Sequence, residues 1–136
     1  LHEHGDNRIH VEGVVLDSHH VNLSEFFRVI GGYMTTEEIR IPTDDGTLAV
    51  QNGNLCPDNK AGTWQVFVYQ TSPETKEIRQ YKLPDFPNYQ LSPYGVVPPA
   101  DCIIFEFSSE TKKKTDKICN FYQIEINKGT YKYIQE

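Results

Sequence analysis

The first twelve residues carry histidines at spacings that could bind a metal ion. His2 and His4 are separated by one residue, and His10 follows a Gly-Asp-Asn at positions 5–7 that is typical of a tight turn. If this turn closes a hairpin, His2 lies opposite His10, and residues two apart on one strand share a face. His2, His4 and His10 would then converge on one ion, with Glu12 next on the same face. Imidazole is a suitable ligand for Cu, Zn or Ni.

The same hairpin also fits a polar, exposed turn that binds nothing. A shift of the turn by one residue would distribute the histidines over both faces of the hairpin. His19 and His20 add at most one ligand, because adjacent residues on a strand point in opposite directions. The sequence therefore predicts a transition-metal site at His2, His4, His10 and Glu12, with a Cu or Zn ion as the cofactor.

Three cysteines allow one disulfide and leave one thiol over. If residues 108–117 close a β-hairpin, Cys102 and Cys119 lie about four residues apart along the ladder, too far to bond directly. We therefore predict that Cys56 pairs with one of them, as a structural disulfide. Asn22 opens an Asn-Leu-Ser sequence and is a candidate glycosylation site, which favours an extracellular or cell-surface protein.

Other chemistry leaves little trace in the sequence. The serines stand in no nucleophile-elbow motif, and no glycine-rich phosphate loop or dinucleotide fingerprint is present. Asp44 and Asp45, and Asp58 with Asn59, lack the ligand spacing of a calcium loop and are typical of turns. The sequence therefore predicts a non-enzymatic protein.

Composition limits the class of partner. The chain has 136 residues, 38% of them hydrophobic, and a formal net charge of −6. This size predicts one domain spanning residues 1–136. An acidic surface repels the phosphates of nucleic acids and anionic lipids. No run approaches the roughly 20 apolar residues of a membrane helix, so we expect no membrane insertion.

Short runs of β-branched and aromatic residues, separated by Gly, Pro, Asn and Asp, predict a mostly β protein. Helical spacing occurs at residues 22–32, where Asn22 or Ser24 can cap the start and the two glycines at 31–32 can end it. The Phe pair of this helix should anchor the core. Strands are predicted at 8–16, 37–43, 47–53, 63–71, 77–83, 100–107, 118–126 and 130–136.

The strand at 63–71 is apolar on both faces and should be central. Five prolines between 84 and 99 predict an ordered loop, pinned by Phe86, Tyr89 and Tyr94. The resulting fold class is α+β and predominantly β. One helix packs on a mixed, β-grasp-like sheet with an added C-terminal hairpin, and an open β-sandwich is the alternative.

Two further functions compete with metal binding. The N-terminal hairpin and the final strand could each add to the free sheet edge of a neighbour. This would make the protein a structural subunit of an extracellular homo-oligomer or filament. A third hypothesis, a carbohydrate- or peptide-binding surface, would use Trp64, Tyr89 and Tyr94.

The opening segment resembles a group of exported archaeal and bacterial proteins. Their shared segment has an H-x-H, a short turn, an I-H-V/I-E strand and a helix with Leu-x-x-Phe-Phe. The matching residues here are His2, His4, Ile9, His10, Val11, Glu12, Leu23, Phe26 and Phe27. The likeness extends loosely to residues 89–107. It implies an exported β-grasp-like domain and supplies no activity.

Overall fold

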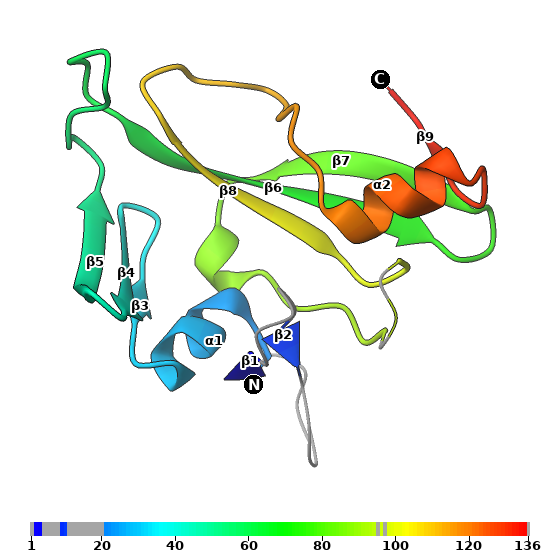
Figure 1. Ribbon diagram of the computed structural model, residues 1–136, viewed down its shortest axis with the longest axis horizontal. Helices are drawn as coiled ribbons and strands as arrows, with labels where there is room; N and C mark the ends of the chain where they lie inside the picture. Colours follow the sequence, from blue (N-terminus) through cyan, green and yellow to red (C-terminus); the bar gives the residue numbers. More distant parts are fainter. Residues whose placement is uncertain (1, 4–8, 11–20, 95, 97, 136) are drawn as a thin grey trace.

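The computed structural model describes residues 2–3, 9–10, 21–94, 96 and 98–135, with the first two segments described by their backbone alone. The architecture is α+β with strands predominating (Figure 1). The described strands form a two-stranded sheet β1-β2, a three-stranded sheet β3-β4-β5 and a four-stranded sheet in the order β8-β6-β7-β9.

The four-stranded sheet is built around β6 (Thr63–Ser72). This strand pairs antiparallel with both β7 (Glu77–Leu83) and β8 (Cys102–Ser108). The side chains of residues 66–69 are at most 2% exposed. The prediction of a central strand with two apolar faces is confirmed, because each face of β6 is covered by a different layer.

Helix α1 (Leu23–Val29) covers one face of this sheet, as its helical spacing predicted. Phe27 is buried and meets Phe105 of β8 edge to face, with ring centroids 5.9 Å apart. The predicted cap is also confirmed, since the side-chain oxygen of Asn22 accepts a hydrogen bond of 2.8 Å from the Glu25 amide.

The two glycines after α1 end the helix for different reasons. Gly31 has φ of +88°, a conformation that side chains disfavour. A Cβ on Gly32 would lie 2.3 Å from the carbonyl oxygen of Arg40, so only glycine allows this close approach. The chain therefore turns sharply from α1 into β3 (Tyr33–Met34).

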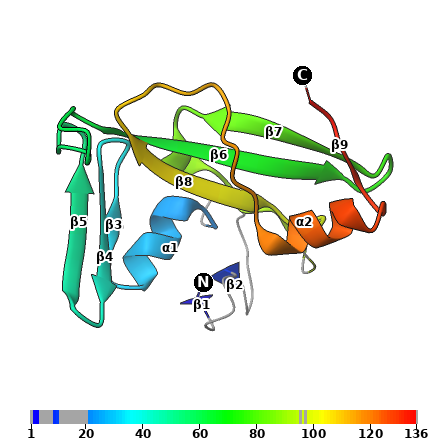
Figure 2. The same ribbon diagram turned by 45° about the horizontal axis from the view of Figure 1, so that its top comes forward.

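The three-stranded sheet continues from β3 into a hairpin of β4 (Glu38–Thr43) and β5 (Gly46–Gln51), which the sequence predicted. Its strands run across the direction of the four-stranded sheet, and α1 lies in the angle between the two sheets (Figure 2). The Trp64 indole of β6 donates a hydrogen bond of 2.8 Å to the Val50 carbonyl. This bond ties the two sheets together.

Helix α2 (Asn120–Asn127) covers the other face of the four-stranded sheet and buries Tyr122 completely. The prediction of a strand at 118–126 is wrong, and so is the prediction of a single helix. The segment is rich in residues that favour strands, but Ile118, Tyr122 and Ile126 stand four residues apart. That spacing places Tyr122 and Ile126 on one face of α2, where the sheet can bury them, and Ile118 lies just before the helix begins.

The prediction of a C-terminal hairpin is also wrong. Strand β9 (Lys132–Tyr133) pairs in parallel with β7 at the far edge of the sheet. Residues 109–119, which we call the strap, connect β8 to α2 by crossing the sheet (Figure 1). The strap therefore takes the place of the predicted hairpin turn.

The proline-rich stretch at residues 84–99 was predicted to be a loop. Its described residues form no strand and contain one short helical turn, η2 (Phe86–Asn88). Phe86 is buried and Tyr89 half-buried, as expected of residues that pin a loop. Tyr94 is 45% exposed, so it is not an anchor.

Candidate functional site

The opening histidines were predicted to face each other across a hairpin. Strand β1 (His2–Glu3) pairs antiparallel with β2 (Ile9–His10), and His2 is the partner of His10. The predicted register is therefore confirmed for this pair. The other predicted ligands, His4 and Glu12, lie outside the described residues, as do His19 and His20. Among the residues that are described, no group of three or more His, Cys, Asp or Glu is placed to hold a metal ion.

The cysteine prediction is wrong. Cys102 is bonded to Cys119, with their Cα atoms 5.9 Å apart, and Cys56 carries the free thiol. A regular hairpin would have kept Cys102 and Cys119 apart along its ladder. The strap instead brings the chain back over the start of β8, where the amide of Cys119 donates to the Cys102 sulfur.

The remaining sequence candidates have structural contacts. Asn22, the glycosylation candidate, caps α1 and forms an isolated bridge with Gln90. Of the proposed aromatic binding surface, Trp64 donates to a carbonyl inside the fold, and Tyr89 donates a hydrogen bond of 2.6 Å to the Asp101 carboxylate. Their polar groups are thus occupied within the protein.

Two glutamines of the four-stranded sheet hold the strap. The Gln65 side chain donates to the Glu110 carbonyl at 2.7 Å and accepts from the Lys112 amide at 2.8 Å. The Gln80 side chain accepts from the Thr115 amide at 2.8 Å and donates to the Thr115 carbonyl at 3.1 Å. Each glutamine therefore pairs with strap backbone as a neighbouring strand would, and fixes the path of the strap.

A buried carboxylate lies beneath the strap. Glu106 of β8 is 8% exposed and accepts hydrogen bonds from the Thr115 hydroxyl and, at 3.1 Å, from the Lys112 ammonium. Burial raises the pKa of Glu106, but its bonds to Thr115 and Lys112 lower it, so that the pKa lies below its usual value. The folded protein therefore favours the charged form of Glu106.

We expect Glu106→Gln to lower the free energy of unfolding at pH 7 by about 1–3 kcal/mol, because a hydrogen-bonded charge is lost. A carboxylate with a lowered pKa in the folded state stabilises above its unfolded pKa, and this contribution disappears as the pH falls through the folded value. The difference between variant and wild type should therefore shrink from pH 7 to about pH 3, as measured by urea unfolding.

The control is Glu110→Gln, which changes an exposed carboxylate of the same strap. It should alter stability by less than about 0.5 kcal/mol at both pH values. A loss in Glu106→Gln that is equal at pH 7 and pH 3 would contradict a role for the Glu106 charge.

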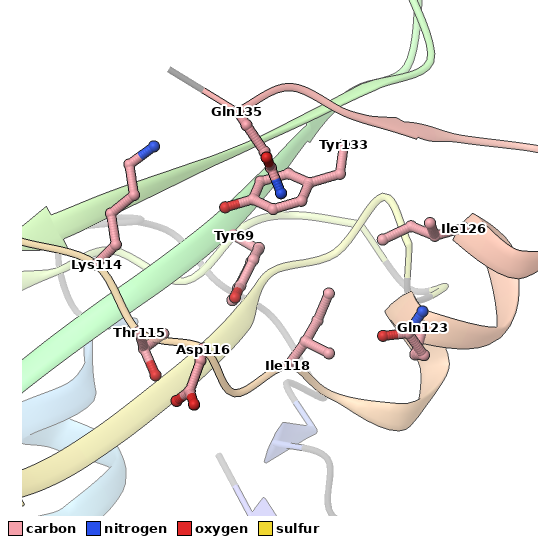
Figure 3. Close-up of a pocket in the computed structure, with 9 residues that line it drawn as sticks. All are labelled: Tyr69, Lys114, Thr115, Asp116, Ile118, Gln123, Ile126, Tyr133 and Gln135. Atoms are coloured by element: carbon pink, nitrogen blue, oxygen red, sulfur yellow. The ribbon is translucent and has the colours of Figure 1, made fainter.

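A pocket of about 570 Å³ opens between the strap, α2 and β9 (Figure 3). Its inner wall contains two tyrosines, Tyr69 of β6 and Tyr133 of β9, whose ring centroids are 5.6 Å apart. Ile118 of the strap and Ile126 of α2 point into the space beside them (Figure 3). The pocket thus exists only because the strap and α2 lie over this face of the sheet.

The tyrosine hydroxyls of the pocket belong to the same polar network as the strap. The Tyr69 hydroxyl donates to the Lys117 carbonyl at 2.6 Å, and burial raises its pKa to about 12. The Gln80 amide nitrogen also lies within hydrogen-bond distance of the hydroxyls of Tyr69, at 3.2 Å, and Tyr133, at 3.1 Å, so three acceptors share its two hydrogens. Tyr69 is therefore neutral at physiological pH and positions the strap.

No family model, curated protein or solved structure matches the chain. The function must therefore be argued from the residues themselves. The strap and the pocket were not predicted from the sequence, although the sequence contains a signal for them. Gln65, Gln80 and Glu106 are polar residues within strands of a buried sheet, and such residues require partners.

Proposed function

We propose that the protein is an exported, non-enzymatic domain that binds a transition metal ion, Cu, Zn or Ni, through its N-terminal histidine hairpin. His2 and His10 are the central ligands. The sequence pattern adds His4 and Glu12 as further ligands. The observation that carries the proposal is the pairing of His2 with His10 across two antiparallel strands.

The register supports metal binding through its geometry. Directly opposed residues of an antiparallel pair have Cβ atoms about 4.5–5.5 Å apart. Two imidazoles at this spacing reach a common ion at the usual Zn–N distance of about 2.0–2.1 Å without a change in the backbone. A hairpin therefore provides two of the ligands at little cost in conformational entropy.

One observation supports export. The Cys102–Cys119 disulfide is of the kind that persists in oxidising surroundings. Within the described residues, no helix has the length and apolar character needed to cross a membrane. As part of the same proposal, the mixed sheet with α1 on one face is β-grasp-like, and α2 is an addition on the opposite face.

The test is zinc binding by a His2→Ala/His10→Ala double variant. We expect about one Zn²⁺ per wild-type chain after dialysis and elemental analysis, and a loss of affinity greater than about 100-fold in the variant. Cobalt substitution provides a visible absorption band that reports the coordination. Binding to the wild type should weaken below about pH 6.5, because protonated imidazole cannot bind metal.

The matched control is His19→Ala/His20→Ala, which removes the same number of histidines from another segment. This variant should retain its zinc. Equal loss in the two variants, or a wild type that takes up no zinc at neutral pH, would contradict the assignment to the hairpin.

Self-assembly through strand edges is the second candidate. Strand β9 pairs with β7 on one side and is the last strand of its sheet among the described residues, so its outer edge could still accept a strand from a neighbour. In the part of the chain that is described, β5 is a terminal strand, and no residue from Gly46 to Gln51 is charged. Charged residues commonly block edge pairing, so their absence favours strand addition here. A particle larger than a monomer by light scattering, unchanged when zinc is removed, would favour this function over metal binding.

A further inference from the structure

The pocket beneath the strap has the dimensions of a small-molecule site. Its volume of about 570 Å³ lies within the usual range for ligand pockets, about 300–1,000 Å³. Four elements supply its walls, namely β6, the strap, α2 and the C-terminal segment with β9. The disulfide and the glutamine contacts hold the strap in place. The pocket is therefore held open by specific contacts.

The interior of the pocket combines apolar side chains with ring faces and hydrogen-bonding groups. Ile118 and Ile126 line it on one side, and the half-buried ring of Tyr133 lies on the other (Figure 3). The Tyr133 hydroxyl accepts a hydrogen bond from Gln80, and none of the described residues accepts its proton. It can therefore donate to a ligand. A ring face attracts the weakly positive C–H groups of a ligand stacked on it.

The polar groups at the rim are balanced in charge. Gln123 and Gln135 contribute neutral amides, and the amide nitrogen of Gln123 already donates to Asn127 at 2.8 Å. The carbonyl oxygen of Gln123 lies on the pocket side of α2 (Figure 3). Lys114 and Asp116 add one positive and one negative charge, and their charged ends point away from each other (Figure 3). This rim favours neither an anion nor a cation.

We propose that this pocket binds a neutral, hydroxylated ring of the size of a hexose. Stacking on Tyr133 and contact with the two isoleucines would hold the C–H face of the ring. The Gln123 oxygen, the Gln135 amide and the Tyr133 hydroxyl would bind the ring hydroxyls. The Asp116 carboxylate supplies a further acceptor at the edge.

The test uses the full chain, isotopically labelled, and titrations with the methyl glycosides of glucose, galactose, mannose and N-acetylglucosamine followed by NMR. We expect at least one glycoside to shift the signals of Tyr133, Gln123 and Ile126, with a dissociation constant of about 0.1–10 mM. Gln123→Ala/Gln135→Ala should weaken that binding by about tenfold or more. Gln51→Ala, which removes an amide from β5, should leave it unchanged.

A second variant tests the location independently. Ile126→Trp places an indole into the pocket and should abolish binding, while the spectrum outside α2 stays that of the folded protein. Binding that survives Ile126→Trp would overturn the proposal, as would the absence of any shift with all four glycosides at about 50 mM. Tighter binding of tyramine or of 4-hydroxybenzoate, a cationic and an anionic ring, would also overturn it.

Discussion

Replacing Cys102 and Cys119 by alanine should lower the free energy of unfolding by about 3 kcal/mol. The disulfide closes a loop between residues 17 apart, and releasing a loop of that length restores about this much conformational freedom to the unfolded chain. The loss should appear in urea unfolding followed by Trp64 fluorescence. The residues of the strap should lose hydrogen-exchange protection before the rest of the sheet does.

Cys56→Ala is the control, because it removes the free thiol and leaves the disulfide intact. This variant should differ from the wild type by less than about 1 kcal/mol. Thiol titration of the unreduced, unfolded wild type should find one reactive cysteine, and peptide mapping should assign it to position 56. A wild type in which Cys56 is blocked would contradict the Cys102–Cys119 pairing.

The second large effect is expected in α1. Phe27→Ala should lower the free energy of unfolding by about 3–5 kcal/mol, since it removes a buried ring from between two layers. Phe27 is 7% exposed and packs edge to face on both Phe26, at 5.6 Å, and Phe105, at 5.9 Å. The truncation therefore leaves a cavity at the junction of α1 with the sheet. Urea unfolding measures the loss.

Two variants on the same helix make this test specific. Phe27→Leu keeps much of the volume and should cost less than about 1.5 kcal/mol. Val29→Ala changes a side chain that is 46% exposed and should cost no more than about 0.5 kcal/mol. Comparable losses in Phe27→Ala and Val29→Ala would contradict the packing of α1 through Phe27. If Phe27→Ala fails to fold, Phe27→Leu and Val29→Ala still test the packing of α1, because Phe27→Leu should lower the free energy of unfolding more than Val29→Ala does.

Local patterns determined much of the fold. Apolar spacing, an Asn cap and paired glycines specify α1 within one turn, and alternation specifies the central strand β6. The turn at 44–46 specifies the β4–β5 hairpin. The strands that pair His2 with His10 are also close in sequence. In each case the decisive contacts are between residues near in sequence, so the sequence alone contains them.

The tertiary structure decided the C-terminal third of the chain. Residues 118–126 have the composition of a strand. In the folded protein β8 already pairs with β6, and the face of the sheet that carries Tyr69 and Ile78 has apolar side chains to bury. The segment therefore folds as α2, whose Tyr122 is buried on that face. Intrinsic strand preference is worth at most about 1 kcal/mol per residue and gives way to burial of this kind.

The same long-range contacts decided the disulfide and the pocket. Cys119 reaches Cys102 only because the strap crosses the sheet, and Gln65 and Gln80 hold that crossing through partners 30 or more residues away in sequence. The sequence determined which residues are polar within the strands. Only the tertiary structure decided what they bind, because the partners of a strap are set by how the layers pack and not by local spacing.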